Sequence, residues 1–277
     1  MYETITYETV SLPDTYDSDT EANISVDSGS DESIYIARVT INRPEVNNSL
    51  NVKSFEEIAD VFLDIDRDET VRTVILTGNG KNFSAGGDIN DMTTKGLISY
   101  ESSKKAAKMG EAIKRCSKPV IAAINGTAAG AGLGLALACD LRVMSEKSKL
   151  MTAFVNMGLA GDTGTLYHLY HIVGLSKATE LMMLSEPISG KNAIEMGLTT
   201  LLTEDYELEE KAISLAESLS QKPPIALKLQ KELVYKCCYS DFDSYCEMEA
   251  NFFDKCGETK DHMEAVTAFF EKRSLYF

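Results

Sequence analysis

The feature that most constrains the fold is the stretch 119–138, which carries no charged side chain. It is long enough to cross a bilayer as a helix. However, it contains Asn125 and four glycines, and Asp140 follows it closely. Because glycines at this density interrupt a helix, we interpret the stretch as a buried strand at 119–124, a glycine-rich turn and a buried helix at 133–138.

Short apolar segments alternate with amphipathic segments through the first part of the chain, which indicates an α/β architecture. Further strands are predicted at 1–12, 34–41, 74–77 and 141–144, and helices at about 51–64 and 100–115. Beyond Gly174 the pattern is helical, with helices predicted at 176–184, 190–195 and 207–221 and, after Pro223 and Pro224, to the C-terminus.

Residues 13–33 differ from the rest of the chain in composition, being acidic and rich in serine and turn-forming residues. A segment of this kind contributes little apolar surface to a core. We therefore expect a solvated loop or a long hairpin between the first two predicted strands.

The overall composition excludes several function classes. A net charge of −16 argues against nucleic acid or an anionic membrane as a partner, because both bind basic surfaces. The hydrophobic fraction of 44% is sufficient for a sizeable core. Six cysteines without a CxxC pair, and no apparent signal peptide, predict a reduced, cytoplasmic protein without a disulfide framework.

Two glycine-rich turns could carry chemistry, one at 83–89 and one at 125–134. Small residues allow a ligand to approach the backbone closely, and a helix N-terminus offers unpaired N–H donors. Two such turns facing one another could stabilise a carbonyl oxygen that gains negative charge, as an oxyanion hole does. The alternative is tight packing of helix on strand. Neither turn matches a P-loop or a dinucleotide-binding motif.

These turns also carry a family resemblance. Together with four further motifs, they resemble the crotonase (enoyl-CoA hydratase/isomerase) superfamily in order and spacing over residues 34–277. The six motifs are INRPE at 41–45, FSAGGDI at 83–89, KPVIAAING at 118–126, GLA at 158–160, AIEMGL at 193–198 and FEKR at 270–273.

The resemblance implies a fold, an assembly and a substrate. It divides the chain into an N-terminal strand with an acidic insertion (1–33), a core of ββα turns arranged as a spiral (34–206) and a C-terminal helical region that forms trimers (207–277). It implies a coenzyme A thioester as substrate, no separate cofactor, and a homotrimer or a dimer of trimers.

The resemblance also assigns residues to the thioester. The oxyanion N–H groups would be those of Gly87 and Ala131, with Ala85 and Gly130 beside them in the substrate-binding site. Removing one such donor typically costs about 2.7–4 kcal/mol of transition-state stabilisation. Near the C-terminus, Lys272 and Phe269 would contact the adenine and phosphate end of coenzyme A; the alternative is an ordinary solvated helix.

The acid/base groups depart from the family pattern. The two glutamates that manage water in the family's hydratases correspond by spacing to Gly134 and Phe154, neither of which can transfer a proton; Phe154 would instead line the acyl site. One carboxylate remains nearby, Asp162. This segment is similar to the dienoyl-CoA isomerase branch, where the matching aspartate transfers protons, and to the 4-chlorobenzoyl-CoA dehalogenase branch, where it is the nucleophile. A helix cap is the alternative role.

The partners of that aspartate in both branches are missing. The isomerase's glutamate corresponds to Phe154, and the dehalogenase's histidine to Ala107. Glu111 lies one helical turn from Ala107 and is a possible second acid/base, but a solvated helix face beside Lys108 and Lys114 is the favoured interpretation. His168 and His171 have no third ligand at a suitable spacing, so no metal site is expected.

We therefore expect an enoyl-CoA or dienoyl-CoA double-bond isomerase, because moving a double bond needs one shuttling base whereas hydration needs a managed water. Three alternatives stay open. They are an enoyl-CoA hydratase, a dehalogenase or hydrolase with Asp162 as nucleophile, and an acyl-CoA-binding protein without chemistry.

Overall fold

The computed structural model describes residues 2–12, 34–92 and 97–277; the predicted insertion at 13–33 lies outside them. The main sheet has six strands in the order β1-β2-β3-β4-β6-β9. The first pair of strands is antiparallel and all later pairs are parallel. These strands are β1 (Ile5–Ser11), β2 (Tyr35–Ile41), β3 (Val71–Gly78), β4 (Val120–Ile124), β6 (Leu141–Ser145) and β9 (Leu201–Thr203).

A second, smaller sheet lies beside the first and has the order β5-β7-β8. Its strands are β5 (Thr127–Ala129), β7 (Lys149–Met151) and β8 (Ile188–Ser189). Because β4 and β5 are separated only by Asn125 and Gly126, the chain passes directly from the main sheet into the small one. Repeated steps of this kind, each followed by a helix, give the spiral of ββα turns.

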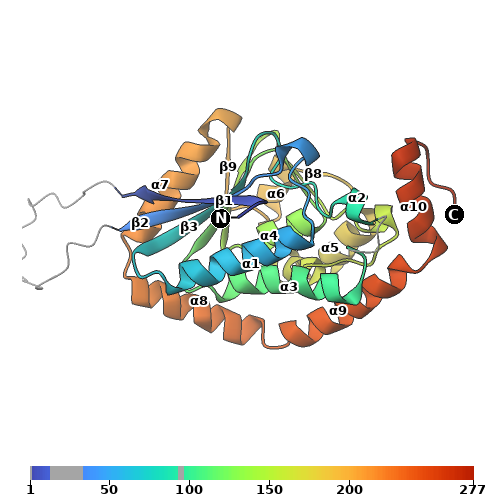
Figure 1. Cartoon of the computed structure of the whole chain (residues 1–277). Helices are drawn as coiled ribbons and strands as arrows, with labels where there is room; N and C mark the ends of the chain where they lie inside the picture. Colours follow the sequence, from blue (N-terminus) through green and yellow to red (C-terminus); the bar gives the residue numbers. More distant parts are fainter. Residues whose placement is uncertain (1, 13–33, 93–96) are drawn as a thin grey trace, which may run out of the picture.

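Helices cover both faces of the main sheet (Figure 1). On one face, α1 and α3 run side by side, with α4 buried between them and the rest of the core. On the other face, α7 packs on β3, β4 and β6. The bounds are α1 (Val52–Arg67), α2 (Ile89–Met92), α3 (Tyr100–Arg115), α4 (Ala131–Ala138), α5 (Thr165–Leu184), α6 (Gly190–Glu195) and α7 (Leu208–Ser220), with short 3-10 helices η1 (Pro44–Val46), η2 (Val155–Met157) and η3 (Asp205–Glu207).

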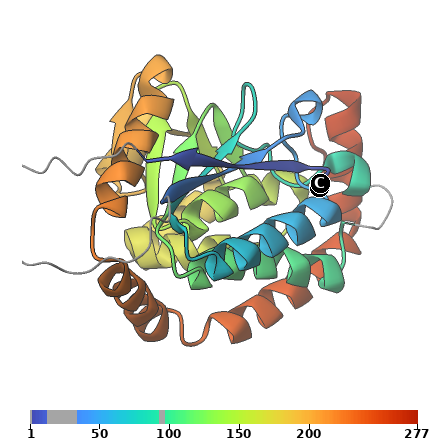
Figure 2. The same ribbon diagram turned by 60° about the vertical axis from the view of Figure 1, so that its left-hand side comes forward.

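The C-terminal helices wrap around this core. They are α8 (Pro224–Cys238), α9 (Phe242–Gly257) and α10 (Lys260–Glu271). Figures 1 and 2 show α8 and α9 passing below α3, after which α10 turns upward at the far end of the molecule. There α9 contacts α3, and α10 contacts η2. The C-terminal region therefore closes one end of the core.

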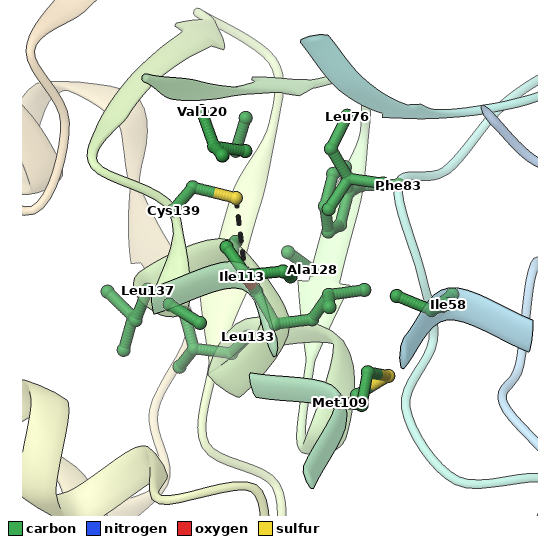
Figure 3. Packing of buried hydrophobic residues seen from close by; sticks show 14 of the residues in the cluster. Ile58, Leu76, Phe83, Met109, Ile113, Val120, Ala128, Leu133, Leu137 and Cys139 are labelled. Atoms are coloured by element: carbon green, nitrogen blue, oxygen red, sulfur yellow. Dashed lines mark hydrogen bonds between the residues drawn. The ribbon is translucent and has the colours of Figure 1, made fainter. Parts of the chain in front are cut away.

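The largest core cluster fills the space between the main sheet, α1, α3 and α4. Figure 3 shows Leu76 and Val120 from the sheet facing Ile113 of α3 and Leu133 of α4. All four side chains are fully buried. Every residue of α4 is buried, which explains why the uncharged stretch shows no amphipathic pattern.

The elements predicted from the sequence are largely those observed, with instructive differences. The uncharged stretch folds as β4, β5 and α4, so the expected turn contains a strand, Thr127–Ala129. Helix α5 includes the helix predicted at 176–184, and a non-helical Gly174 (φ 78°) separates that part from the first part of α5, which begins at Thr165. No helix in the described ranges is both long and apolar enough to span a membrane.

We expect Asn51→Ala to lower the free energy of unfolding by about 1 kcal/mol, because Asn51 caps α1. Its side chain accepts a hydrogen bond from the Ser54 N–H at 2.9 Å, and the Ser54 hydroxyl completes a capping box. Urea denaturation measures the change. The control is Asn251→Ala, at an exposed site within α9, which should stay within about 0.5 kcal/mol of the unmodified protein. Equal losses in both variants would contradict the capping role.

Candidate active site

The two glycine-rich bends predicted to face one another are in direct contact. Ser84 and Thr127–Ala129 pair as short strands do: the Ser84 N–H donates to Thr127 O at 3.0 Å, and the Ala129 N–H donates to Ser84 O at 3.0 Å. Gly86 (φ +96°) lies so close to the second bend that a Cβ there would be 2.7 Å from Ala129 O. Only glycine fits at this point, for both steric and conformational reasons.

Each bend presents one N–H group that has no protein acceptor within the described residues. The backbone on both sides of Gly87 pairs with Leu50: Gly86 O accepts from Leu50 N–H, and Asp88 N–H donates to Leu50 O. The N–H of Gly87 itself has no acceptor among the described residues. Ala131 is the first residue of α4, where backbone N–H groups lack intrahelical partners. Gly130 (φ 51°) turns the chain into that helix. Both N–H groups are therefore available to a ligand.

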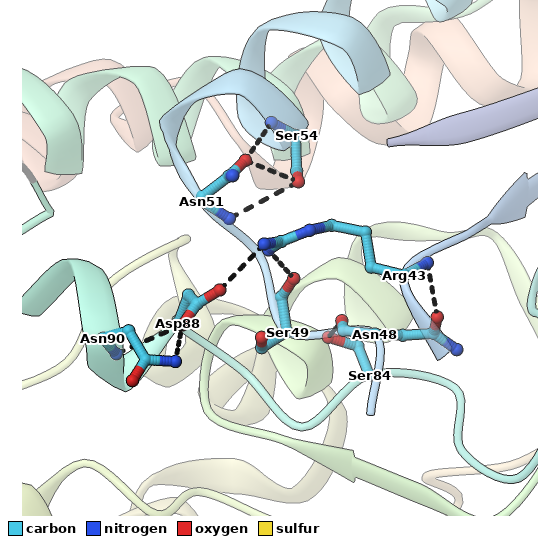
Figure 4. Close-up of polar contacts among 8 residues, drawn as sticks. All are labelled: Arg43, Asn48, Ser49, Asn51, Ser54, Ser84, Asp88 and Asn90. Atoms are coloured by element: carbon cyan, nitrogen blue, oxygen red, sulfur yellow. Dashed lines mark hydrogen bonds and ion pairs between the residues drawn. The ribbon is translucent and has the colours of Figure 1, made fainter. Parts of the chain in front are cut away.

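A polar network around Arg43 fixes the first bend (Figure 4). The guanidinium of Arg43 pairs with the Asp88 carboxylate at 2.9 Å and donates to Ser49 O at 2.7 Å. Both charged side chains are largely buried. On the other side of the bend, the Ser84 hydroxyl donates to Asn48 O at 2.8 Å. The segment after β2 thus holds the bend at both ends.

A cavity of about 370 Å³ opens beside the two bends. Its wall includes Gly87 and Ala131, the predicted oxyanion pair, together with Asp162. Four of the predicted substrate-binding residues line it as well, namely Ala85, Gly130, Phe154 and Phe269. The remaining wall is predominantly apolar, with Ile89, Met92, Leu97, Met157, Leu159 and Phe253 among its residues. Among the described residues, the cavity therefore combines two unpaired backbone donors, one carboxyl group and an apolar lining.

Asp162 is the carboxyl group on this wall, and it is only 6% exposed. Burial raises the pKa of Asp162 from 3.8 to about 7, and the Thr163 hydroxyl, 3.2 Å from Oδ1, offsets part of that effect. No ion pair to Asp162 occurs among the described residues. A carboxyl with such a pKa can both accept and return a proton near neutrality.

The positions that correspond to the hydratase glutamates are occupied by other groups. At Gly134, an added Cβ would overlap the Thr163 hydroxyl and would lie 2.6 Å from Thr165 Oγ1. Thr163 itself has a strained positive φ of 57°. At the second position, the Phe154 ring packs with Leu159 and Phe253. The first position has no room for a side chain, and the second is apolar.

Two of the predicted residues lie outside this cavity. Lys272 is exposed and follows α10, whereas its neighbour Arg273 lines the wall. Arg273 is held there by Glu264, whose Oε2 accepts from Nη2 at 2.8 Å. Glu111 lies on α3, lines a separate hollow and pairs with Arg115 at 2.7 Å. Glu111 therefore does not share a cavity with Asp162, and the prediction that it could be a second acid/base is wrong.

A different carboxyl lies next to the Asp162 loop and was missed from the sequence. Glu249 of α9 is 6% exposed, and its Oε2 accepts a hydrogen bond from the Gly164 N–H at 2.8 Å. Burial raises the pKa of Glu249 to about 8, and the charge of Asp162 adds to this rise. The available signal was helical spacing, because Glu249 shares a buried face with Phe242, Cys246 and Phe253.

A comparison with protein-family models identifies residues 31–277 as an enoyl-CoA hydratase/isomerase sequence. The chain belongs to this family. The crotonase resemblance drawn from the six motifs is thereby confirmed, and so is the expected ββα spiral with a helical C-terminal region.

Known relatives span hydratases and isomerases. The short-chain-enoyl-CoA hydratase of Clostridium acetobutylicum is 34% identical over 87% of this chain and 93% of its own length. The trans-2-decenoyl-[acyl-carrier-protein] isomerase of Streptococcus mutans is 32% identical over 87% and 94%. Among solved structures, an enoyl-CoA hydratase from Mycobacterium avium subsp. paratuberculosis superimposes with a TM-score of 0.81 at 29% identity, covering 87% of this chain and 94% of that one.

We expect Arg43→Ala to lower the free energy of unfolding by about 3–5 kcal/mol, because it leaves the buried Asp88 carboxylate without its partner. Urea denaturation measures this change, and the same variant should bind acyl-CoA more weakly because the first bend loses its support. Arg67→Ala is the control: Arg67 is exposed and pairs with Asp64 only at 3.5 Å. A loss no larger than that of the control would show that the Arg43–Asp88 pair does not hold the bend.

We expect Asp162→Asn to stabilise the protein, and more so at pH 8 than at pH 5. The pKa of Asp162 is about 7 in the folded state and about 4 in the unfolded state. As pH rises between these two values, only the unfolded chain ionises readily, so the aspartate lowers the free energy of unfolding increasingly up to about pH 7. The upper bound of this cost is about 4 kcal/mol. Urea denaturation at the two pH values measures it. A difference between the variant and the unmodified protein that does not change with pH would contradict the raised pKa.

Proposed function

We propose that this member of the family is an acyl-CoA double-bond isomerase acting on enoyl-CoA or dienoyl-CoA thioesters. The observation that carries the proposal is a single buried carboxyl, Asp162, in the same cavity wall as the two unpaired N–H groups of Gly87 and Ala131. The Streptococcus mutans relative is named a trans-2-decenoyl-[acyl-carrier-protein] isomerase, and that name is consistent with this chemistry.

In the proposed reaction, the thioester oxygen accepts hydrogen bonds from Gly87 N–H and Ala131 N–H. The ionised Asp162 takes a proton from a carbon beside the carbonyl system, and the electron pair of the broken C–H bond moves toward the thioester oxygen. Asp162 then returns the proton to a different carbon as the electrons move back. The double bond has moved, the carboxylate is restored and no other reactant is consumed.

The cavity lining supports isomerisation over hydration. Adding water to a double bond requires groups that hold and activate that water, and the residues at positions 134 and 154 offer none. The apolar wall around Phe154 would also disfavour an ordered water molecule. Hydration remains the second candidate, because the Clostridium acetobutylicum relative carries that name.

The proposal is tested by Asp162→Asn with 3-enoyl-CoA, 2-enoyl-CoA and dienoyl-CoA substrates. The double-bond position in each product is assigned by ¹H NMR, and addition of water is detected by mass spectrometry. We expect the unmodified protein to shift double bonds without a gain of 18 mass units from water, and the variant to be slower by about 10²- to 10⁴-fold. Glu111→Gln is the matched carboxyl control and should keep its activity, because Glu111 lies outside the cavity.

Three results would contradict the proposal. Undiminished double-bond movement by Asp162→Asn would remove Asp162 from the reaction. Predominant formation of a hydrated product would identify a hydratase. A covalent acyl adduct on Asp162 during a single turnover would instead indicate nucleophilic attack, as in a dehalogenase or hydrolase.

For the oligomeric state we propose a homotrimer or a dimer of trimers. Light scattering on the same samples measures it.

A further inference from the structure

Thr163 stands in a backbone conformation that its side chain disfavours. It is fully buried, and its φ of 57° lies in the left-handed region, which a β-branched residue rarely adopts. Such strain persists only where the surrounding structure holds it, and it clusters at functional sites. A glycine would adopt this conformation without strain, so the reason for a threonine at this position lies in its side chain.

The hydroxyl of Thr163 contacts the carboxyl group of Asp162. Its Oγ1 lies 3.2 Å from Asp162 Oδ1, and among the described residues no other group hydrogen-bonds this carboxyl. The second carboxyl oxygen, Oδ2, is open to the cavity, because His168 Nε2 is the only buried side-chain polar atom of the described residues that lacks a partner. One carboxyl oxygen of Asp162 therefore meets the protein, and the other meets the cavity.

The neighbouring Thr165 leaves the hydroxyl proton of Thr163 available to that carboxyl. The backbone oxygen of Asp162 lies 2.7 Å from Thr163 Oγ1 and competes for the proton. However, this oxygen already accepts from the Thr165 N–H at 3.0 Å and from the Thr165 hydroxyl at 2.9 Å, and a carbonyl oxygen has two lone pairs. An ionised carboxylate is also the stronger acceptor. The proton of Thr163 therefore points to Oδ1 when Asp162 is ionised.

Two other titratable groups face the loop of Asp162 from neighbouring helices. Glu249 of α9 accepts from the Gly164 N–H at 2.8 Å, and His168 of α5 lies so close that a Cβ added at Gly164 would be 3.5 Å from its Nε2. On the cavity side, the charged group is Arg273. Substitution of the threonine leaves all three groups in place, so a change at Asp162 then measures the loss of the hydroxyl.

We propose that Thr163 is a positioning residue, whose hydroxyl holds Oδ1 of Asp162 so that Oδ2 faces the substrate carbon. The inference rests on the proposed function, because Asp162 moves a proton only in that reaction. Thr163 is itself absent from the cavity wall, so it acts through Asp162. The terminal torsion of an aspartate has a broad minimum, and without this contact Oδ2 would face the cavity for less of the time. The ionised form would also lose its hydrogen bond.

The test compares three substitutions at position 163. Thr163→Val removes the hydroxyl and keeps the shape of the side chain, Thr163→Gly removes it and relieves the positive φ, and Thr163→Ser keeps it. In each variant, kcat and KM are measured with 3-enoyl-CoA, and the titration of Asp162 is followed by carboxyl ¹³C NMR. The signal of Asp162 is assigned by its loss in Asp162→Asn. The kcat values are taken from the plateau at high pH, where Asp162 is ionised in every variant.

We expect Thr163→Val and Thr163→Gly to lower kcat by roughly 10- to 100-fold with KM nearly unchanged, because a hydrogen bond to a charged group is lost and the oxyanion donors are not. The midpoint of Asp162 should move to higher pH by about one pH unit, because only the ionised form loses stabilisation. Thr163→Ser should preserve both values. Thr77→Val is the control, since it removes a buried hydroxyl that donates to Ala123 O at 2.9 Å, outside the cavity wall.

Two results would overturn the inference. One is an unchanged kcat and an unchanged Asp162 midpoint in Thr163→Val or Thr163→Gly, and the glycine substitution decides the matter if the valine substitution does not fold. The other is a loss in Thr163→Ser as large as that in Thr163→Val, because the hydroxyl would then not be the group that matters.

The NMR titrations do not require turnover, so they distinguish failure of this inference from failure of the proposed function. If Asp162→Asn retains isomerisation while Thr163→Val raises the Asp162 midpoint, the hydroxyl holds the carboxyl and only the catalytic assignment fails. If Asp162→Asn loses isomerisation while Thr163→Val changes neither kcat nor the midpoint, only the inference about Thr163 fails.

Discussion

The site depends on the contact between the two glycine-rich bends. Gly86 lies against Ala129, and a short strand pairing through Ser84 joins the segment after β3 to the segment after β4. This contact fixes the separation of Gly87 and Ala131, whose N–H groups have no acceptor in the part of the chain that the structure describes. A side chain larger than hydrogen at position 86 would push the bends apart. The chemistry of the cavity therefore begins with backbone packing rather than with a reactive side chain.

The rest of the molecule supports that contact from several directions. The Arg43–Asp88 pair holds the first bend from the strand β2 side, and α4 anchors the second bend in the core. Asp162 reaches the same cavity on a loop that Glu249 holds from α9. Each functional group thus comes from a different part of the chain, and the spiral brings them together.

The same packing explains how one fold can serve different reactions. Thr163 and Thr165 fill the space beside Gly134, and Phe154 fills the space beside Gly130. Where a family hydratase would place carboxylates, this chain places a hydroxyl and a ring. The backbone donors are unaffected by these replacements, because they depend on glycine geometry. In the proposed reaction, activation of the thioester and transfer of the proton therefore depend on separate parts of the structure.

The sequence was a good guide to whatever depends on local pattern. Glycine spacing and motif order led to Gly87, Ala131 and Asp162, and all three line one cavity. It was a poorer guide to contacts between distant segments. The strand Thr127–Ala129 is too short to have a period, and Glu249 gains its place only when α9 crosses behind the Asp162 loop.

Two smaller differences have equally physical causes. Beyond α10 the residue at 272 takes a left-handed conformation, which turns Arg273 rather than Lys272 toward the cavity. Glu111 was considered because of its helical spacing from Ala107, yet both residues line a hollow between α3 and α9 that is separate from the cavity. Spacing along a helix identifies a face, but only the packing of that helix decides what the face meets.

The central claim is that two backbone N–H groups polarise the thioester carbonyl, and isotope-edited infrared spectroscopy tests it most directly. A saturated acyl-CoA labelled with ¹³C at the carbonyl, which has no double bond to move, would be bound to the unmodified protein. The account predicts a carbonyl stretch at lower frequency than that of the free thioester, because both hydrogen bonds lengthen the C=O bond. A bound carbonyl whose frequency equals that of the free thioester would contradict it.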